Sequence, residues 1–133
     1  MIFADTSFFV AGADDRDRHH ETALQLFERV AGRRIVTSNH VQGETWTTLR
    51  RKLWHGRAVE ILNTVEGPDR HIQVAHVPDE LEAEALRWLR RHDEREYSFV
   101  DATSFAYMRA KGIEEALAFD GDFAAAGFTE LRP

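Results

Sequence analysis

The 133-residue sequence contains no cysteine, no long apolar run and no excess of positive charge. The missing cysteine excludes disulfides, thiolate metal sites and thiol nucleophiles, and it favours a reducing, cytoplasmic setting. The longest apolar stretches are a few residues long, far below the roughly 20 residues that cross a bilayer, so no membrane association is expected. The amino-terminal residues show no basic leader with a cleavage pattern, which argues against a signal peptide.

The composition is typical of a globular protein, because 43% of the residues are apolar and 30% are charged. A chain of this length buries roughly two-thirds of its unfolded surface and fits one domain. No linker, repeat or low-complexity segment interrupts the sequence. We therefore predict a single domain over residues 1–133.

The net charge of −6, with histidine neutral, is unusual for a protein that binds nucleic acid. The cations are clustered, however, and divalent cations on a few carboxylates would reverse the local field. The basic clusters are Arg50, Arg51, Lys52 and Arg57, and Arg87, Arg90, Arg91 and Arg95. The overall charge thus disfavours a nucleic-acid substrate without excluding it.

Predicted strands alternate with predicted helices along the chain. The expected strands are 2–5, 35–37, 72–77, 116–119 and 128–131. The expected helices are 20–31, 39–53, a segment through 59–65 that Gly67-Pro68 ends, one from Asp79 through Leu89, and 101–111 before Gly112. This alternation is typical of βαβ units and predicts an open, mostly parallel α/β sheet covered on both faces.

Four acidic residues are expected at one edge of this sheet. In open α/β sheets, ligands bind beyond the carboxyl ends of the strands. Asp5 and Asp120 each end a predicted strand, and Asp101 follows the apolar pair Phe99-Val100. Glu44 lies in the first turn or two of the helix after the second strand. Carboxylates from four distant segments would therefore converge.

Each acid taken alone also has a purely structural explanation. Asp101 fits a helix N-cap, and Asp120-Gly121-Asp122 fits a turn. Glu44 fits a solvated helix surface, and Asp5 fits a cap of a following helix. The joint placement favours a functional role, because crowded carboxylates disfavour ionisation unless cations bind them.

Carboxylates without cysteine suit hard cations such as Mg²⁺ or Mn²⁺. Two such ions about 4 Å apart activate water and stabilise the leaving oxygen of a phosphodiester. His19-His20 is a poor chelate, because adjacent helical residues point about 100° apart, and it fits a solvated helix start. Thr6 and Ser7 after Asp5, and Thr103 and Ser104 after Asp101, could support carboxylates or a phosphate, although capping is the simpler explanation.

The acids lie in segments whose order and spacing resemble those of the PIN-domain family. These segments are Ile2-Phe3-Ala4-Asp5-Thr6-Ser7, Glu44, Ser98-Phe99-Val100-Asp101-Ala102 and Ala118-Phe119-Asp120-Gly121-Asp122-Phe123. More narrowly, the chain resembles the VapC toxins of bacterial VapBC toxin–antitoxin modules over its whole length. Each motif is weak alone, but the four in this order are specific.

The resemblance implies a three-layer α/β/α fold with a parallel sheet of order 3-2-1-4-5. It also implies a type II toxin with Mg²⁺- or Mn²⁺-dependent endoribonuclease activity. Asp5, Glu44, Asp101 and Asp120 match the family's acidic quartet, and Asp122 would be a lesser metal ligand. Thr6 matches the polar residue that follows the first aspartate in the family.

The resemblance further implies a homodimer inhibited by a VapB-type antitoxin, whose carboxyl-terminal segment lies in a groove near the acids. Trp46 and Trp54 would line that groove or, like Trp88, belong to the core. The polar loop 92–98 looks like the loop of VapC members that cut the sarcin–ricin loop of ribosomal RNA, and tRNA is the other common target. Phosphate contacts are expected from Arg50, Arg51, Lys52, Arg90, Arg91 and Arg95, which otherwise are solvated helix faces.

Two other functions remain open from the sequence. A phospho-acceptor domain would place paired acids after the first strand and a lysine after a late core strand, whereas this chain has only Asp5 and no lysine beyond Lys111. A non-catalytic protein-binding module would use the acids as caps and turns. The binding module predicts no thermal shift with divalent cations, whereas the nuclease predicts one.

Overall fold

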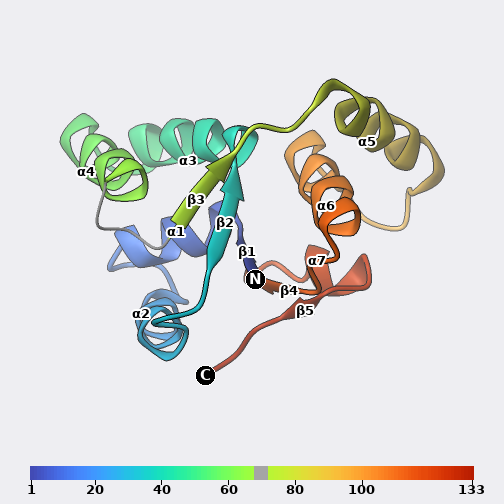
Figure 1. The fold of residues 1–133 in the computed structure, drawn as a ribbon. Helices are drawn as coiled ribbons and strands as arrows, with labels where there is room; N and C mark the ends of the chain where they lie inside the picture. The colour runs from blue at the N-terminus through green and yellow to red at the C-terminus, as the bar shows by residue number, and fades with distance from the viewer. Residues whose placement is uncertain (68–71) are drawn as a thin grey trace.

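A computed structural model describes residues 1–67 and 72–133. Figure 1 shows a central sheet, with α3 and α4 on one side of it and α5 and α6 on the other. The strands are β1 (Ile2–Ala4), β2 (Ile35–Ser38), β3 (Ile72–Ala75), β4 (Glu115–Leu117) and β5 (Thr129–Glu130). The helices are α1 (Thr6–Ala13), α2 (His20–Arg29), α3 (Asn39–Lys52), α4 (His55–Glu66), α5 (Asp79–Arg91), α6 (Phe99–Lys111) and α7 (Asp122–Ala125).

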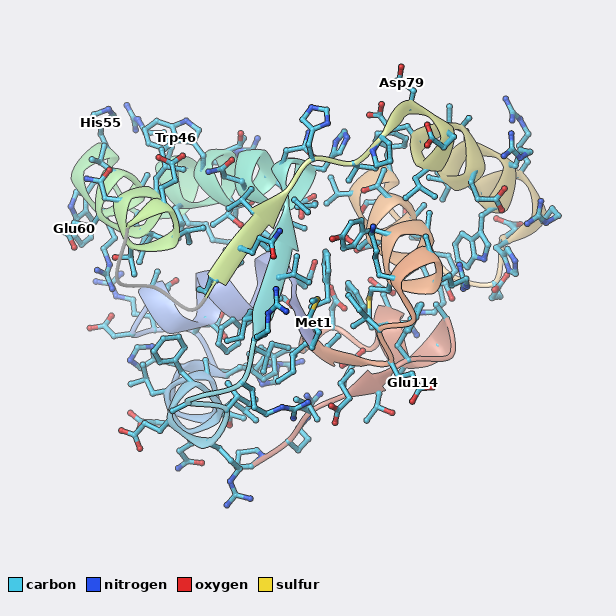
Figure 2. The ribbon with its side chains drawn as sticks, viewed as in Figure 1. Met1, Trp46, His55, Glu60, Asp79 and Glu114 are labelled. Carbon is cyan, nitrogen blue, oxygen red and sulfur yellow. The ribbon has the colours of Figure 1, made fainter. Side chains whose placement is uncertain are left out.

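The five strands are parallel and lie in the order β3-β2-β1-β4-β5, which confirms the predicted sheet. The central strand β1 pairs with both β2 and β4, with Ile2 opposite Ile35 on one side and Glu115 on the other. Met1 and Glu114, labelled in Figure 2, precede β1 and β4 and so mark the amino edge of the sheet. The connections from β1 and β4 leave in opposite directions, which places a crevice at their carboxyl ends.

The main core covers both faces of β1. All three residues of β1 are fully buried, which explains why the strand is continuously apolar instead of alternating. Phe3 contacts Tyr107 of α6 and Phe123 of α7, each at a ring-centroid distance of 6.2 Å. A smaller cluster joins α1, α3 and α4 through Val10, Ala13, Leu49 and Ala58. The carboxyl end of β1 is thus held between helices on both sides.

The structure adds two helices that were not predicted, α1 and α7, and changes the bounds of several other elements, including β3, which ends at Ala75, and β5, which covers Thr129–Glu130. Residues 6–13, which the sequence analysis left without a helix, form α1, and Asp5 is its N-cap. The helix predicted from Asp101 begins at Phe99, because Ser98 is its N-cap. Residues 118–119, expected in a strand, follow the end of β4, and α7 begins at Asp122 within the expected turn. Gly67 caps α4 as expected, whereas Pro68 lies outside the described residues.

The three tryptophans have different environments. Trp88 is buried in the main core, as one of the two interpretations expected. Trp46 is half-buried against the smaller cluster, where its ring meets His55 edge-on, and both are labelled in Figure 2. Trp54 is 60% exposed and therefore does not belong to the core. Within the described ranges, no helix has the length and apolarity that a bilayer crossing requires.

Candidate active site

A pocket of about 560 Å³ opens beyond the carboxyl ends of β1 and β4. Residues from α1, α3 and α6, from the segment that follows β4 and from the loop before α2 form its walls. The structure brings all four sequence-predicted acids to this pocket: Asp5, Glu44, Asp101 and Asp120. Their sequence separation means that only the folded sheet creates this acidic surface.

Asp5 is the most deeply buried of these acids, with 2% of its surface exposed. Its Oδ2 accepts hydrogen bonds from the backbone N–H and the hydroxyl of Ser7, at 3.1 and 2.7 Å. Its Oδ1 is buried and has no hydrogen-bond partner in the described part of the chain. Burial, followed by the nearby Asp120 carboxylate, raises the pKa of Asp5 from 3.8 to about 8. A buried, partnerless carboxylate oxygen is a position that a bound cation would satisfy.

Ser7 links Asp5 to the segment that carries Asp120. Its hydroxyl donates to Asp5 and accepts the backbone N–H of Phe119 at 3.1 Å. Thr6 also lines the pocket, and its hydroxyl is buried without a partner among the described residues. Both side chains therefore lie where the sequence analysis placed them, next to the first aspartate.

Asp101 has a structural role as well as a place in the pocket. It forms a capping box in which its Oδ2 accepts from the Ser98 N–H and its own N–H donates to the Ser98 hydroxyl, both at 3.0 Å. Burial, helped by the negative charges of Asp120 and Asp122, raises the pKa of Asp101 from 3.8 to about 6. Asp101 is therefore the cap that the structural explanation expected, and it also lines the pocket.

Asp120 and Asp122 flank Gly121, whose φ of 84° is the left-handed conformation that glycine adopts readily. Asp120 lies at the pocket rim, and partial loss of solvation around its carboxylate raises its pKa. One carboxylate oxygen from each of Asp101, Asp120 and Asp122 lies within 4.8 Å of the others. Three oxygen ligands this close, with no nitrogen or sulfur ligand, fit Mg²⁺ or Mn²⁺.

Glu44 and Asp5 face this three-acid group without belonging to it. Glu44 projects from α3 and also lines a second hollow with His40 and Arg51. The compact group of Asp101, Asp120 and Asp122 therefore overlaps the pocket at Asp101 and Asp120, whereas Asp122 is not among the residues that line it. The sequence analysis treated Asp122 as the lesser ligand, but the geometry places it in the compact group.

Thr103 and Ser104 do not reach the pocket. Both hydroxyls donate to the carbonyl oxygen of Val100, at 2.7 and 2.9 Å, and both residues are fully buried. Short polar side chains in a helix commonly bond to the preceding turn in this way. Of the two alternatives, the structure shows a local backbone role for both side chains inside α6 and not the contact with a carboxylate or phosphate.

The basic residues differ in how they are engaged. Arg95 donates through Nε to Asp122 at 2.8 Å and through a terminal nitrogen to the Asp120 carbonyl at 3.1 Å, so it is not the free phosphate ligand that was expected. Arg87 and Arg91 pair with Glu84. Lys52 lines the pocket and Arg51 lines the neighbouring hollow, while Arg50 and Arg90 are exposed.

The sequence analysis missed one wall of the pocket, which the loop before α2 supplies through Asp17, Arg18 and His19. From the sequence, His19 and His20 were interpreted as the solvated start of a helix and not as a chelate. Because α1 was not predicted, the return of this loop to the carboxyl edge of the sheet was not predicted either. The available signal was the turn-forming run Asp14-Asp15 close to the histidine pair.

A parallel sheet of order 3-2-1-4-5 with carboxylates beyond its carboxyl edge defines an α/β domain with an acidic pocket where ligands of such sheets bind. The family model of the PIN domain matches residues 2–129, and the chain belongs to this family. The PIN-domain resemblance found in the sequence is thereby confirmed.

Known relatives agree with this assignment. The 23S rRNA-specific endonuclease VapC20 of Mycobacterium tuberculosis is 54% identical over 137 aligned positions, which cover 100% of this chain and 99% of that protein. The crystal structure of M. tuberculosis VapC20, described as a sarcin–ricin loop cleaving toxin, has a TM-score of 0.93 and 52% identity, with 100% of both chains covered. FitAcB from Neisseria gonorrhoeae has a TM-score of 0.69 at 13% identity over 98% of this chain and 96% of that one, which supports the fold alone.

Arg95 is expected to position the turn Asp120-Gly121-Asp122 for a cation. In the Arg95→Gln protein, we expect Mn²⁺ to bind about tenfold more weakly, because outer hydrogen bonds orient ligating carboxylates and their loss costs about 10- to 100-fold in affinity. Loss of the positive charge by itself favours cation binding by only about 1 kcal/mol, because solvent screens it, and the tenfold loss is the net effect after this gain. Isothermal titration calorimetry measures the change, with Arg91→Gln as the control because Arg91 pairs with Glu84 instead. Equal or tighter Mn²⁺ binding by Arg95→Gln would show that the contact does not position Asp122 for metal.

Proposed function

We propose that the chain is the toxin of a type II toxin–antitoxin module and a metal-dependent endoribonuclease that cuts the sarcin–ricin loop of 23S ribosomal RNA. The observation that carries this proposal is the meeting of Asp5, Glu44, Asp101 and Asp120 in one pocket. It is supported by full-length similarity to a relative named as an endonuclease of that RNA.

The metal is Mg²⁺, for which Mn²⁺ can substitute. Asp101, Asp120 and Asp122 would hold it, and Oδ1 of Asp5, which has no hydrogen-bond partner among the described residues, would be a further oxygen ligand from outside that group. A bound dication supplies hydroxide at neutral pH and neutralises charge on the phosphodiester. The donor set fits this ion because every ligand is a carboxylate oxygen.

The remaining groups bind and orient the reactants. Glu44, on the α3 wall, would accept a hydrogen bond from the attacking water and so direct its oxygen at phosphorus. The water oxygen forms the new bond, the bond to the 3′ oxygen breaks, and that oxygen leaves with a proton. The products are 5′-phosphate and 3′-hydroxyl ends. Thr6 would hydrogen-bond a phosphate oxygen with its free hydroxyl.

The exposed cations would hold the folded RNA around the pocket. Lys52, Arg51 and Arg50 end α3, and Arg90 and Arg91 end α5. The loop 92–98 joins α5 to the helix that carries Asp101, so it borders the pocket. Contacts to phosphates from these residues would recognise RNA shape, as is usual for a structured target.

The proposed protein partners are a VapB-type antitoxin and a second copy of the chain. Trp54, exposed at the N-cap of α4, and half-exposed Trp46 offer apolar surface for such a contact. The proposed place of action is the cytoplasm, where ribosomes are.

The alternative functions are less well supported by the geometry. Lys111 lies at the opposite end of α6 from Asp101, so it does not serve as the lysine of a phospho-acceptor site. A pure binding module explains Asp5 as the N-cap of α1, but it gives no reason for Glu44 and Asp120 in the same pocket as Asp5.

The test is to induce the protein in bacteria and map the 5′ ends of cellular RNA, with Asp5→Asn as the inactive control. A single new 5′ end within the sarcin–ricin loop supports the proposal. New ends confined to tRNA would overturn the substrate assignment but not the nuclease activity. No new end in any RNA would overturn the nuclease assignment itself.

A further inference from the structure

His19 is held flat against an aromatic ring at the edge of the pocket. Its imidazole stacks on the ring of Phe119 with a centroid distance of 4.7 Å and an interplanar angle of 8°. Phe119 directly precedes Asp120, and both Phe119 and His19 line the pocket. Among the described residues, no ring or cation stacks on the other side of His19. His19 is therefore the last ring of the stack, and its second face is available to a planar ligand in the pocket.

The position of His19 is fixed before any ligand binds. Its backbone N–H donates to Oδ1 of Asp17 at 2.8 Å, and Arg18 Nε donates to its Nε2 at 3.1 Å. The ring of the next residue, His20, hydrogen-bonds the Ala11 carbonyl at 2.8 Å and so ties the loop to α1. A ring immobilised in the free protein loses little conformational entropy when it binds a ligand.

Phe119 is itself held in place from another side. The guanidinium of Arg132 lies 5.3 Å from its ring centroid, and the same group donates to the Ala118 carbonyl at 3.0 Å. The stack of His19 on Phe119 is therefore built on anchored backbone beside Asp120. Such a rigid aromatic platform gives a flat surface for a planar ligand.

Arg18 gives the same wall an available positive charge. Arg18 Nε donates a hydrogen bond to His19. Among the described residues, the terminal nitrogens of Arg18 have no hydrogen-bond partner and the side chain forms no ion pair. Lys52 across the pocket is likewise unpaired within that part of the chain. An aromatic platform flanked by unpaired cations matches a nucleobase with its adjoining phosphates, because single-stranded RNA is held by stacking and by backbone charge.

We propose that the exposed face of His19 stacks on one unpaired nucleobase next to the phosphodiester cut at the acidic pocket, and that Arg18 binds a phosphate of the same strand. This inference rests on the proposed function, and it assigns recognition of the RNA to the wall of the pocket that carries His19 and Arg18. His19 selects an unstacked base, which a loop offers and a regular helix does not. The cut would therefore be confined to loops even where the cations accept any RNA.

The experiment is a double-mutant cycle between His19 and the RNA. The probe is an RNA hairpin with the sarcin–ricin loop sequence, in versions with a single abasic nucleotide at each position around the cut. Binding is measured by fluorescence anisotropy in the Asp5→Asn background, which prevents cleavage. At one position, the abasic change is expected to weaken binding about 5- to 100-fold. The same change should cost almost nothing once His19→Ala is present.

Matched variants separate stacking from folding. His19→Phe should keep the dependence on that base, whereas His19→Leu, with similar bulk but no flat ring, should lose it. His55→Ala, which removes an aromatic contact with Trp46 outside the pocket, should leave it unchanged. Arg18→Gln should weaken binding of every hairpin alike and reduce the salt dependence by about one unit of slope.

Additive effects at every RNA position would overturn the inference, even if the wild-type protein cuts the hairpin. A dependence that survives in His19→Leu would overturn it as well, since stacking would not be its cause. A wild-type protein that cuts no RNA would instead overturn the proposed function, on which the inference depends.

Discussion

Replacing Asp5 by asparagine is expected to reduce RNA cleavage by about a thousandfold or more while preserving the fold. The change removes one metal-binding carboxylate, and the charge stabilisation that a catalytic dication supplies is worth several kcal/mol, or about tenfold in rate per 1.4 kcal/mol. Asparagine keeps an oxygen that can accept both hydrogen bonds from Ser7, so the N-cap of α1 is retained.

The measurement is single-turnover cleavage of the sarcin–ricin hairpin with Mn²⁺, alongside growth after induction in bacteria. Asp79→Asn is the matched control, because Asp79 is an exposed acid at the start of α5, labelled in Figure 2. It should cleave at the wild-type rate. If Asp5→Asn is folded and also cleaves at that rate, Asp5 has no part in catalysis.

The sequence predicted the acids well because strand ends in a parallel sheet are easy to locate. Asp5 follows a continuously apolar segment, and Asp120 follows another, so both had to meet at the carboxyl edge. The sheet order came from the family resemblance, since the periodicity of single strands does not say which strands are neighbours. Fold class and acid convergence were therefore accessible without coordinates.

The walls of the pocket were harder to predict, for reasons seen at particular residues. Helix α1 contains the run Phe8-Phe9-Val10-Ala11 and is buried on most sides, so it has no apolar stripe with helical period. Without α1, the returning loop with His19 could not be placed. Arg95 was assigned to phosphate from charge alone, whereas its partner Asp122 lies 27 residues further along the chain. Contacts between distant segments depend on tertiary geometry.

The clustered acids also make the metal-free protein sensitive to pH. The folded protein holds protons on Asp5 up to a pKa of about 8 and on Asp101 up to a pKa of about 6, whereas the ordinary value is 3.8. Between pH 3.8 and the raised pKa of each group, the unfolded chain has released a proton that the folded chain keeps. Stability therefore falls as pH rises, since its slope with pH follows the protons bound by the unfolded minus the folded state.

In EDTA, we expect the contribution of these two groups to the free energy of unfolding to be complete below about pH 4 and to fall by several kcal/mol toward pH 8. Each unit of raised pKa corresponds to about 1.4 kcal/mol. Urea unfolding at a series of pH values measures the trend. In Asp5→Asn the decline should end near pH 6, because the contribution of Asp5 is gone and Asp101 has a pKa of about 6. A wild-type protein that becomes more stable from pH 5 to pH 8 in EDTA would contradict this electrostatic account.

Mn²⁺ should reverse this dependence, because a dication binds the deprotonated carboxylates and so competes with their protons. The increase in melting temperature caused by a fixed Mn²⁺ concentration should be small at pH 5 and large at pH 8, where the repulsion it relieves is greatest. Differential scanning fluorimetry at both pH values, with Asp5→Asn and Asp79→Asn in parallel, makes the comparison. Only Asp5→Asn should lose most of the pH 8 shift. A shift that is equal at both pH values would mean that Mn²⁺ binds away from the acids whose pKa values are raised.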